Sequence, residues 1–169
     1  GGLEGDKMRR VLPDGFTGAV MAIESIPDAV CMLHGPGGCR IRHMVTSDAV
    51  FHREGAEPSL MVPYHYGFPQ VPATYLDEYD FVNGAEYKSE ECLETIGKRG
   101  LNLVAVVNSP GAGLIGDDHM KAVRENGMEA VAMCINDAPS SRPFTEGYDN
   151  ALRAVLEHLS PVRGAGDGS

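Results

Sequence analysis

The sequence has few cysteines, no long apolar run and no cluster of basic residues. Its four cysteines include no CxxC pair, so a disulfide framework is not expected. No apolar run approaches the ~20 residues of a membrane span, and the start, GGLEGDKMRR, lacks the apolar middle of a signal peptide. Lys and Arg total 14 against 24 Asp and Glu, a net charge of −10 that would repel a nucleic acid. We therefore expect a cytoplasmic protein that binds neither nucleic acid nor membrane.

Several motifs of known enzyme sites are also missing. The six histidines are scattered without HxH or HExxH spacing, so no zinc site is indicated. There is no Walker A sequence and no GxSxG nucleophile elbow. The sequence thus identifies no catalytic residue. A dense acidic stretch at Asp77, Glu78 and Asp80 is interpreted as solvated or partner-facing surface.

The composition is that of a globular chain. With 169 residues, 43% of them hydrophobic and 22% charged, one domain with a proper core is expected. Residues 1–10 are Gly-rich and are expected to be an added, cut or disordered start. The domain should occupy residues 11–160, and residues 161–169 should form a linker-like or disordered tail.

Short apolar runs alternate with amphipathic segments, which is the pattern of a parallel sheet covered by helices. The predicted fold class is therefore α/β, a three-layer Rossmann-like domain with a mostly parallel sheet flanked by helices. Strands are predicted over residues 29–33, 101–107 and 129–135, with a weaker candidate over 59–62. Helices are predicted over residues 17–25, 86–99, 114–126 and 148–159, with another after residue 39.

The first loop that could carry chemistry is HGPGGC, His34 to Cys39, after the first predicted strand. Its glycines Gly35, Gly37 and Gly38 let the backbone approach a bulky ligand. A cysteine at the start of the next helix has its pKa lowered by the helix dipole, so Cys39 could bind a metal or cluster, or act as a nucleophile. The alternative is a glycine-rich turn followed by a buried cysteine. Cys31, Cys92 and Cys134 are interpreted as core residues.

The second loop is NSPGAGLIGDD, Asn108 to Asp118, in which GAGLIG matches the G-x-G-x-x-G fingerprint of dinucleotide-binding domains. Asp137, near the end of the next predicted strand, stands where a ribose-binding acid would belong. However, Asp117 and Asp118 follow the last glycine directly and would compete with a pyrophosphate at the helix start. A nicotinamide cofactor is therefore the less favoured interpretation of this loop.

Together, HGPGGC, VPATYLDEYDFVNGAEYK and NSPGAGLIGDD resemble, in order and spacing, the first domain of the nitrogenase component 1 type oxidoreductases. That superfamily has an HGP-x-GC loop whose cysteine binds an iron-sulfur cluster between subunits, a glycine-rich stretch that opens a helix, and a CP-x-GLIGDD loop. These correspond here to residues 34–39, 84–88 and 109–118. The resemblance implies that Cys39 is a cluster ligand in a homo- or heterodimer, with an ATPase partner of the nitrogenase iron-protein type.

The sequence also departs from the family pattern. Residues 13–16, PDGF, lack an earlier family cysteine, and Ser109 stands at the position of a third one. A [4Fe-4S] cluster normally needs four thiolates. A symmetric dimer would supply Cys39 twice, and Ser109 or a carboxylate would complete the ligand set. Gly35, Gly37, Gly38 and Ser109 are the expected cofactor-binding residues.

The resemblance covers only the first of the family's three domains. We therefore expect a fragment of a nitrogenase-like oxidoreductase subunit that transfers electrons through its cluster to an unknown substrate, and an isolated domain without activity. Two other functions stay open. One is a dinucleotide-binding domain that uses the GAGLIG loop, and the other is an assembly module that has kept the fold and lost the cluster.

Overall fold

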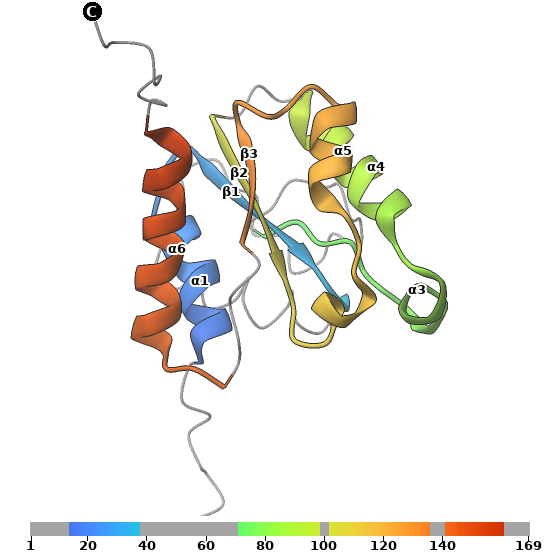
Figure 1. The fold of residues 1–169 in the computed structure, drawn as a ribbon, viewed down its shortest axis with the longest axis horizontal. Coiled ribbons are helices and arrows are strands. Elements are labelled where there is room, and N and C mark those ends of the chain that lie inside the picture. The colour runs from blue at the N-terminus through green and yellow to red at the C-terminus, as the bar shows by residue number, and fades with distance from the viewer. Residues whose placement is uncertain (1–13, 38–70, 99–101, 136–140, 161–169) are drawn as a thin grey trace, which may run out of the picture.

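The computed structural model describes residues 14–37, 71–98, 102–135 and 141–160 (Figure 1). None of the helices in these ranges is long and apolar enough to cross a membrane. The elements, in chain order, are α1 (Gly15–Glu24), β1 (Ala29–His34), α3 (Glu78–Asn83), α4 (Glu86–Gly97), β2 (Leu103–Asn108), the 3-10 helix η1 (Ala112–Ile115), α5 (His119–Glu125), β3 (Ala132–Ile135) and α6 (Phe144–Leu159).

The described strands form one parallel sheet in the order β1-β2-β3. Ala29 lies opposite Leu103 and His34 opposite Asn108, so β1 and β2 begin and end together. The segment from Pro72 to Leu76 lies along the outer edge of β1. There the Leu33 N–H donates a hydrogen bond to the Pro72 carbonyl at 2.8 Å. The predicted parallel sheet is confirmed.

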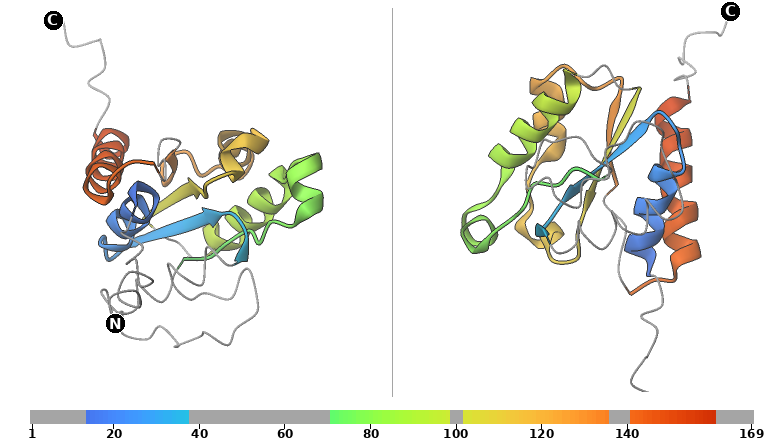
Figure 2. Two further views of the ribbon diagram at one scale, coloured as in Figure 1. Left: turned by 90° about the horizontal axis from the view of Figure 1, so that it is seen from below. Right: turned by 180° about the vertical axis from the view of Figure 1, so that it is seen from behind.

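Helices cover both faces of the sheet, so the domain has three layers (Figures 1 and 2). On one face, α1 and α6 pack over Cys31, Leu33 and the residues of β2 and β3 that point the same way. On the other, α4 and α5 pack over Val30, Met32 and their neighbours. Because both faces are buried, the strands are apolar throughout rather than alternating, which is why continuous apolar runs predict them. The predicted α/β class is confirmed.

Helices α1 and α6 approach one another closely because glycines stand at their contact. A Cβ atom on Gly18 would fall 2.1 Å from the Phe144 carbonyl oxygen, and one on Gly147 would fall 1.9 Å from the Gly15 carbonyl oxygen. The start of α1 is fixed as well, since Asp14 accepts a hydrogen bond from the Thr17 N–H at 2.9 Å. The pair of helices therefore packs backbone against backbone.

The structure differs from the predicted helices at two places. The helix predicted over 114–126 is wrong in its first part, because Gly116 adopts a left-handed conformation with φ of 75° and separates η1 from α5. The short helix α3 was not predicted. It is specified by a capping box in which Asp77 and Asp80 each accept a hydrogen bond from the other's backbone N–H.

Other predictions agree or lie outside the described residues. The helices predicted over 17–25, 86–99 and 148–159 correspond to α1, α4 and α6, with α6 beginning earlier, at Phe144. The strand predicted over 129–135 is shorter, since β3 begins at Ala132. The candidate strand over 59–62, the helix after residue 39 and both expected tails lie outside the described ranges. The domain boundaries at 11 and 160 stay predictions.

The glycine contact between α1 and α6 yields a stability prediction. In Gly147→Ala the new methyl group meets the backbone of Gly15, which cannot move aside cheaply. The cost of this clash should exceed the ~1 kcal/mol gained from alanine's helix propensity. We therefore expect a net decrease in the free energy of unfolding of about 1–3 kcal/mol. Denaturant unfolding would measure it, with Gly113→Ala as control, since no atom lies within 4 Å of a Cβ built there. Equal stability of the two variants would contradict the prediction.

Candidate functional site

The two loops singled out in the sequence leave the sheet side by side at its carboxyl edge. His34 ends β1, Asn108 ends β2, and the two are paired in register. Directly beyond them, the Ser109 N–H donates to the His34 carbonyl at 2.9 Å. A Cβ atom on Gly35 would lie 2.4 Å from Ser109 Oγ, so this approach requires glycine at position 35. The structure thus brings two of the predicted site residues, Gly35 and Ser109, into contact.

Ser109 is buried at this junction with an unsatisfied hydroxyl group. The residue is 2% exposed, and its Oγ has no hydrogen-bond partner among the described residues. Such a group is uncommon in a folded protein, and its hydroxyl is free to bond to a further polar group. Gly37 is described as well, whereas Gly38 and Cys39 lie outside the described residues.

Beneath the loops lies a buried pair of histidines that sequence reasoning did not bring together. The rings of His34 and His119 meet edge to face with centroids 4.5 Å apart. Ser89 Oγ, from α4, lies 3.1 Å from the Nδ1 atom of each ring. His34 Nε2 contacts Asp117 Oδ2 at 2.8 Å, and His119 Nε2 contacts Asn108 Oδ1 at 2.7 Å. The pair joins β1, β2, α4 and α5 at one point.

One arrangement of protons satisfies every group in this network with both rings neutral. His34 then donates from Nε2 to Asp117 and accepts at Nδ1 from the Thr74 hydroxyl at 3.1 Å. His119 donates to Asn108 and accepts from Ser89. The Thr74 oxygen in turn accepts from the Gly35 N–H at 3.1 Å, which ties the network to the glycine loop.

Burial keeps both imidazoles neutral. Burial, with a smaller contribution from the adjacent His34, lowers the pKa of His119 to about 4, although Asp117 and Asp118 oppose the change. Burial also lowers the pKa of His34, although the hydrogen bond and the negative charge of Asp117 act in the opposite direction. The network therefore stabilises the fold in its neutral form.

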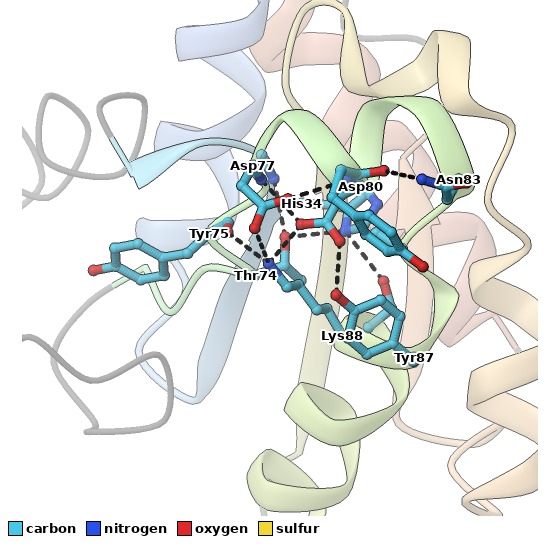
Figure 3. Close-up of polar contacts among 12 residues, drawn as sticks. His34, Thr74, Tyr75, Asp77, Asp80, Asn83, Tyr87 and Lys88 are labelled. Carbon is cyan, nitrogen blue, oxygen red and sulfur yellow. Dashed lines mark hydrogen bonds and ion pairs between the residues drawn. The ribbon is translucent and has the colours of Figure 1, made fainter.

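A second polar cluster joins α3 to α4, and it corrects the interpretation of Asp80 as solvated or partner-facing surface. Asp77 and Glu78 are exposed, but Asp80 is fully buried. Lys88 Nζ lies 2.5 Å from one carboxylate oxygen of Asp80, and the Tyr87 hydroxyl donates to the other at 2.7 Å (Figure 3). Sequence reasoning missed this contact because the partners face each other only once α3 has formed.

The ionised form of Asp80 is strongly favoured in this cluster. Burial alone raises the pKa of a carboxyl group, but hydrogen bonds from Lys88, the Asp77 N–H and Tyr87 outweigh burial and hold the Asp80 pKa at about 2. The hydrogen bond between Tyr87 and Asp80 also raises the pKa of Tyr87, to about 12. Asp80 and Lys88 therefore form a permanent ion pair at neutral pH.

The described cysteines are not arranged as ligands. Cys31 and Cys92 are fully buried in the cores on opposite faces of the sheet, and burial raises the pKa of both thiols. The prediction that these two are core residues is confirmed. Cys134 is half-buried on β3, where its Sγ lies 3.5 Å from Met120 Sδ. Within the described ranges, no group of three or more His, Cys, Asp and Glu side chains is placed to hold a metal ion.

The GAGLIG loop does not have the geometry of a dinucleotide-binding turn. Gly111 and Gly116 flank the 3-10 helix η1, and Gly113 lies within it. Helix α5 starts only after Asp118, whose side chain accepts a hydrogen bond from the Lys121 N–H. A pyrophosphate needs such N–H groups unoccupied. The other acid, Asp117, bonds to His34 and to the Ala85 N–H at 3.0 Å. Asp137 lies outside the described residues.

These features define a class of domain, an α/β unit in which loops at the carboxyl ends of parallel strands form the site. The nitrogenase component 1 type oxidoreductase family matches residues 15–168, and the chain belongs to that family. This confirms the resemblance identified in the sequence.

Solved structures agree on the fold. A structure titled "Nitrogenase Cp1 at pH 6.5" is similar with a TM-score of 0.65 and 18% identity, over 90% of this chain and 32% of that one. A second, "Nitrogenase Cp1 at pH 5", gives a TM-score of 0.61 and 20% identity, over 86% of this chain and 29% of that one. The chain thus spans about a third of the length of these structures. A comparison with curated proteins gives no match.

The neutral histidine pair predicts how stability depends on pH. Between the ordinary histidine pKa of 6.5 and the His119 pKa of about 4, the unfolded chain binds a proton that the folded chain excludes. The stabilisation that neutral His119 gives the fold is therefore complete above pH 6.5. It is lost as the pH falls toward 4, by up to about 3 kcal/mol. Denaturant unfolding between pH 7 and 4 would show a smaller loss for His119→Gln than for the wild type. Equal losses would contradict the assignment.

Proposed function

We propose that the chain is the N-terminal domain of a nitrogenase-like oxidoreductase subunit that transfers low-potential electrons through an iron-sulfur cluster to a substrate. Membership of the nitrogenase component 1 type family carries this proposal. The carboxyl edge of the sheet supports it, because the two loops that correspond to the family's cluster loops begin in direct contact there, at Gly35 and Ser109. When bound, such a cluster supplies one-electron redox chemistry.

Cys39 is the proposed ligand from this chain. It follows Gly37 by two positions in the sequence, and the described cysteines Cys31 and Cys92 are too deeply buried to replace it. The described residues therefore supply the setting of the cluster rather than its thiolates. Ser109 fits that setting, because its buried hydroxyl has no partner among the described residues. We propose a [4Fe-4S] cluster shared between two subunits, with Cys39 contributed by each and Ser109 or a carboxylate completing the set.

A protein partner is part of this proposal. The family is one of multimeric proteins, and we propose a dimer with a component 1 type subunit and electron delivery by an ATPase of the iron-protein type. Helix α3 and the start of α4 support a protein contact, since they expose the large side chains of Tyr79, Phe81, Val82 and Tyr87, of which Val82 is 83% exposed. Exposed apolar side chains that cluster in this way mark interaction surfaces.

Iron analysis tests the cluster directly. In the full-length protein, prepared and reconstituted without oxygen, we expect about two irons and two acid-labile sulfides per chain, the value for a cubane shared by two subunits. Cys39→Ala should abolish iron binding and the visible absorbance, whereas Cys134→Ala, the control for a half-buried thiol, should retain both. Full-length wild-type protein without iron would favour the cluster-free assembly module instead.

A ligand titration tests the dinucleotide alternative. Because Asp118 caps α5 with its own carboxylate, we expect no increase in melting temperature when NADH or NADPH is added at millimolar concentration. A ligand that binds only the folded state at 100 times its Kd would stabilise it by ~2.7 kcal/mol, which a thermal melt detects readily. A clear shift with either cofactor would restore the dinucleotide interpretation of the GAGLIG loop.

A further inference from the structure

The two acids that end the GAGLIGDD motif have different surroundings. Asp118 is exposed and caps α5, where its carboxylate accepts a hydrogen bond from the Lys121 N–H at 3.1 Å. Asp117, by contrast, has a side chain that is only 4% exposed and that points back into the domain, toward the end of β1. Burying a carboxylate is costly unless its oxygens are hydrogen-bonded. The burial of Asp117 therefore calls for an explanation that the exposed Asp118 does not need.

Both carboxylate oxygens of Asp117 accept hydrogen bonds. Oδ1 accepts from the Ala85 N–H at 3.0 Å, at the turn between α3 and α4. Oδ2 lies 2.8 Å from His34 Nε2, at the end of β1. An ionised carboxylate can only accept hydrogen bonds, so His34 must carry its ring proton on Nε2. Because burial keeps this ring neutral, its other nitrogen, Nδ1, is an acceptor.

The acceptor at Nδ1 determines how the glycine loop begins. The Thr74 hydroxyl, 3.1 Å away, donates its one proton to that nitrogen. The Thr74 oxygen is thereby left to accept from the Gly35 N–H, also at 3.1 Å. Gly35 is the residue whose backbone lies against Ser109, where the two loops meet. A chain of hydrogen bonds thus runs from Asp117 through His34 and Thr74 to the first residue of the glycine loop.

We infer that Asp117 is a positioning residue, which fixes the tautomer of His34 and through Thr74 holds the Gly35 N–H at the junction of the two loops. Because the same carboxylate also holds the Ala85 N–H, it ties the turn between α3 and α4 to that junction. Only the view of the junction as the setting of a cluster rests on the proposed function. The tautomer and the hydrogen bond to Gly35 rest on the contacts alone.

Asp117→Asn tests the inference with the smallest change of shape. The Ala85 N–H still requires an acceptor, so the oxygen of the new amide should face it and the NH2 group should face His34. His34 must then accept at Nε2 and carry its proton on Nδ1, where that proton opposes the Thr74 hydroxyl proton. Asp118→Asn is the matched control, because Asp118 caps α5 and asparagine caps helices about as well as aspartate.

Two readouts on the full-length protein follow the tautomer and the loop separately. Solid-state ¹⁵N NMR of protein labelled with [¹⁵N]histidine reports which ring nitrogen of His34 carries the proton, and His34→Gln identifies the signals. Hydrogen exchange, resolved to single residues by mass spectrometry, reports the Gly35 N–H, and exchange within β2 reports overall folding. Neither readout requires iron, so a wild type that binds no iron would refute the proposed function and leave this test intact.

In Asp117→Asn we expect the ring proton of His34 to move to Nδ1 and the Gly35 N–H to exchange several-fold faster, while β2 exchanges as before. Asp118→Asn should match the wild type in both readouts. Thr74→Val should also speed exchange at Gly35, and adding Asp117→Asn to it should change Gly35 little further, because the hydroxyl group that transmits the effect is gone. Additive effects at Gly35, or an unchanged tautomer in Asp117→Asn, would overturn the inference. A wild-type His34 protonated on Nδ1 would overturn it without any variant.

Discussion

The parallel register of β1 and β2 is the constraint on which the rest of this structure depends. It ends both strands at one edge, with His34 beside Asn108. Both strands are buried on both faces, so their last polar side chains must find partners inside the protein rather than in water. The histidine network, the contact between the two loops and the placement of α4 and α5 all follow from satisfying groups at that edge.

Two polar networks of different kinds thus stabilise the site. The neutral histidine pair is interior, and it ties β2 to α4 because His119 donates to Asn108 and accepts from Ser89. The ion pair of Asp80 and Lys88 is peripheral and charged, and it fastens the segment beyond residue 71 to α4. Both networks weaken as the pH falls, the histidine pair as the pH approaches the His119 pKa of about 4 and the ion pair as it approaches the Asp80 pKa of about 2. Neutral pH suits the two together.

The sequence predicts the layers well because burial on two faces leaves continuous apolar runs, as in β1 and β2. It also identifies the two loops, since glycines mark the close approach at position 35. It does not identify the histidine network, because His34 and Asp117 are 83 positions apart and meet only through the strand register. Helix α3 was missed for a local reason, since its capping box consists of acids that resemble solvated surface.

The glycine contact between α1 and α6 has a consequence for how the chain folds. The two helices lie far apart in the sequence, yet each completes the packing of the other. Contacts of such long sequence separation slow folding, because a large loop must close before they form. During synthesis, α1 emerges from the ribosome long before α6 exists, and its glycine face stays unpaired for that time. The nascent chain is therefore most exposed to misassociation until its last described helix has been made.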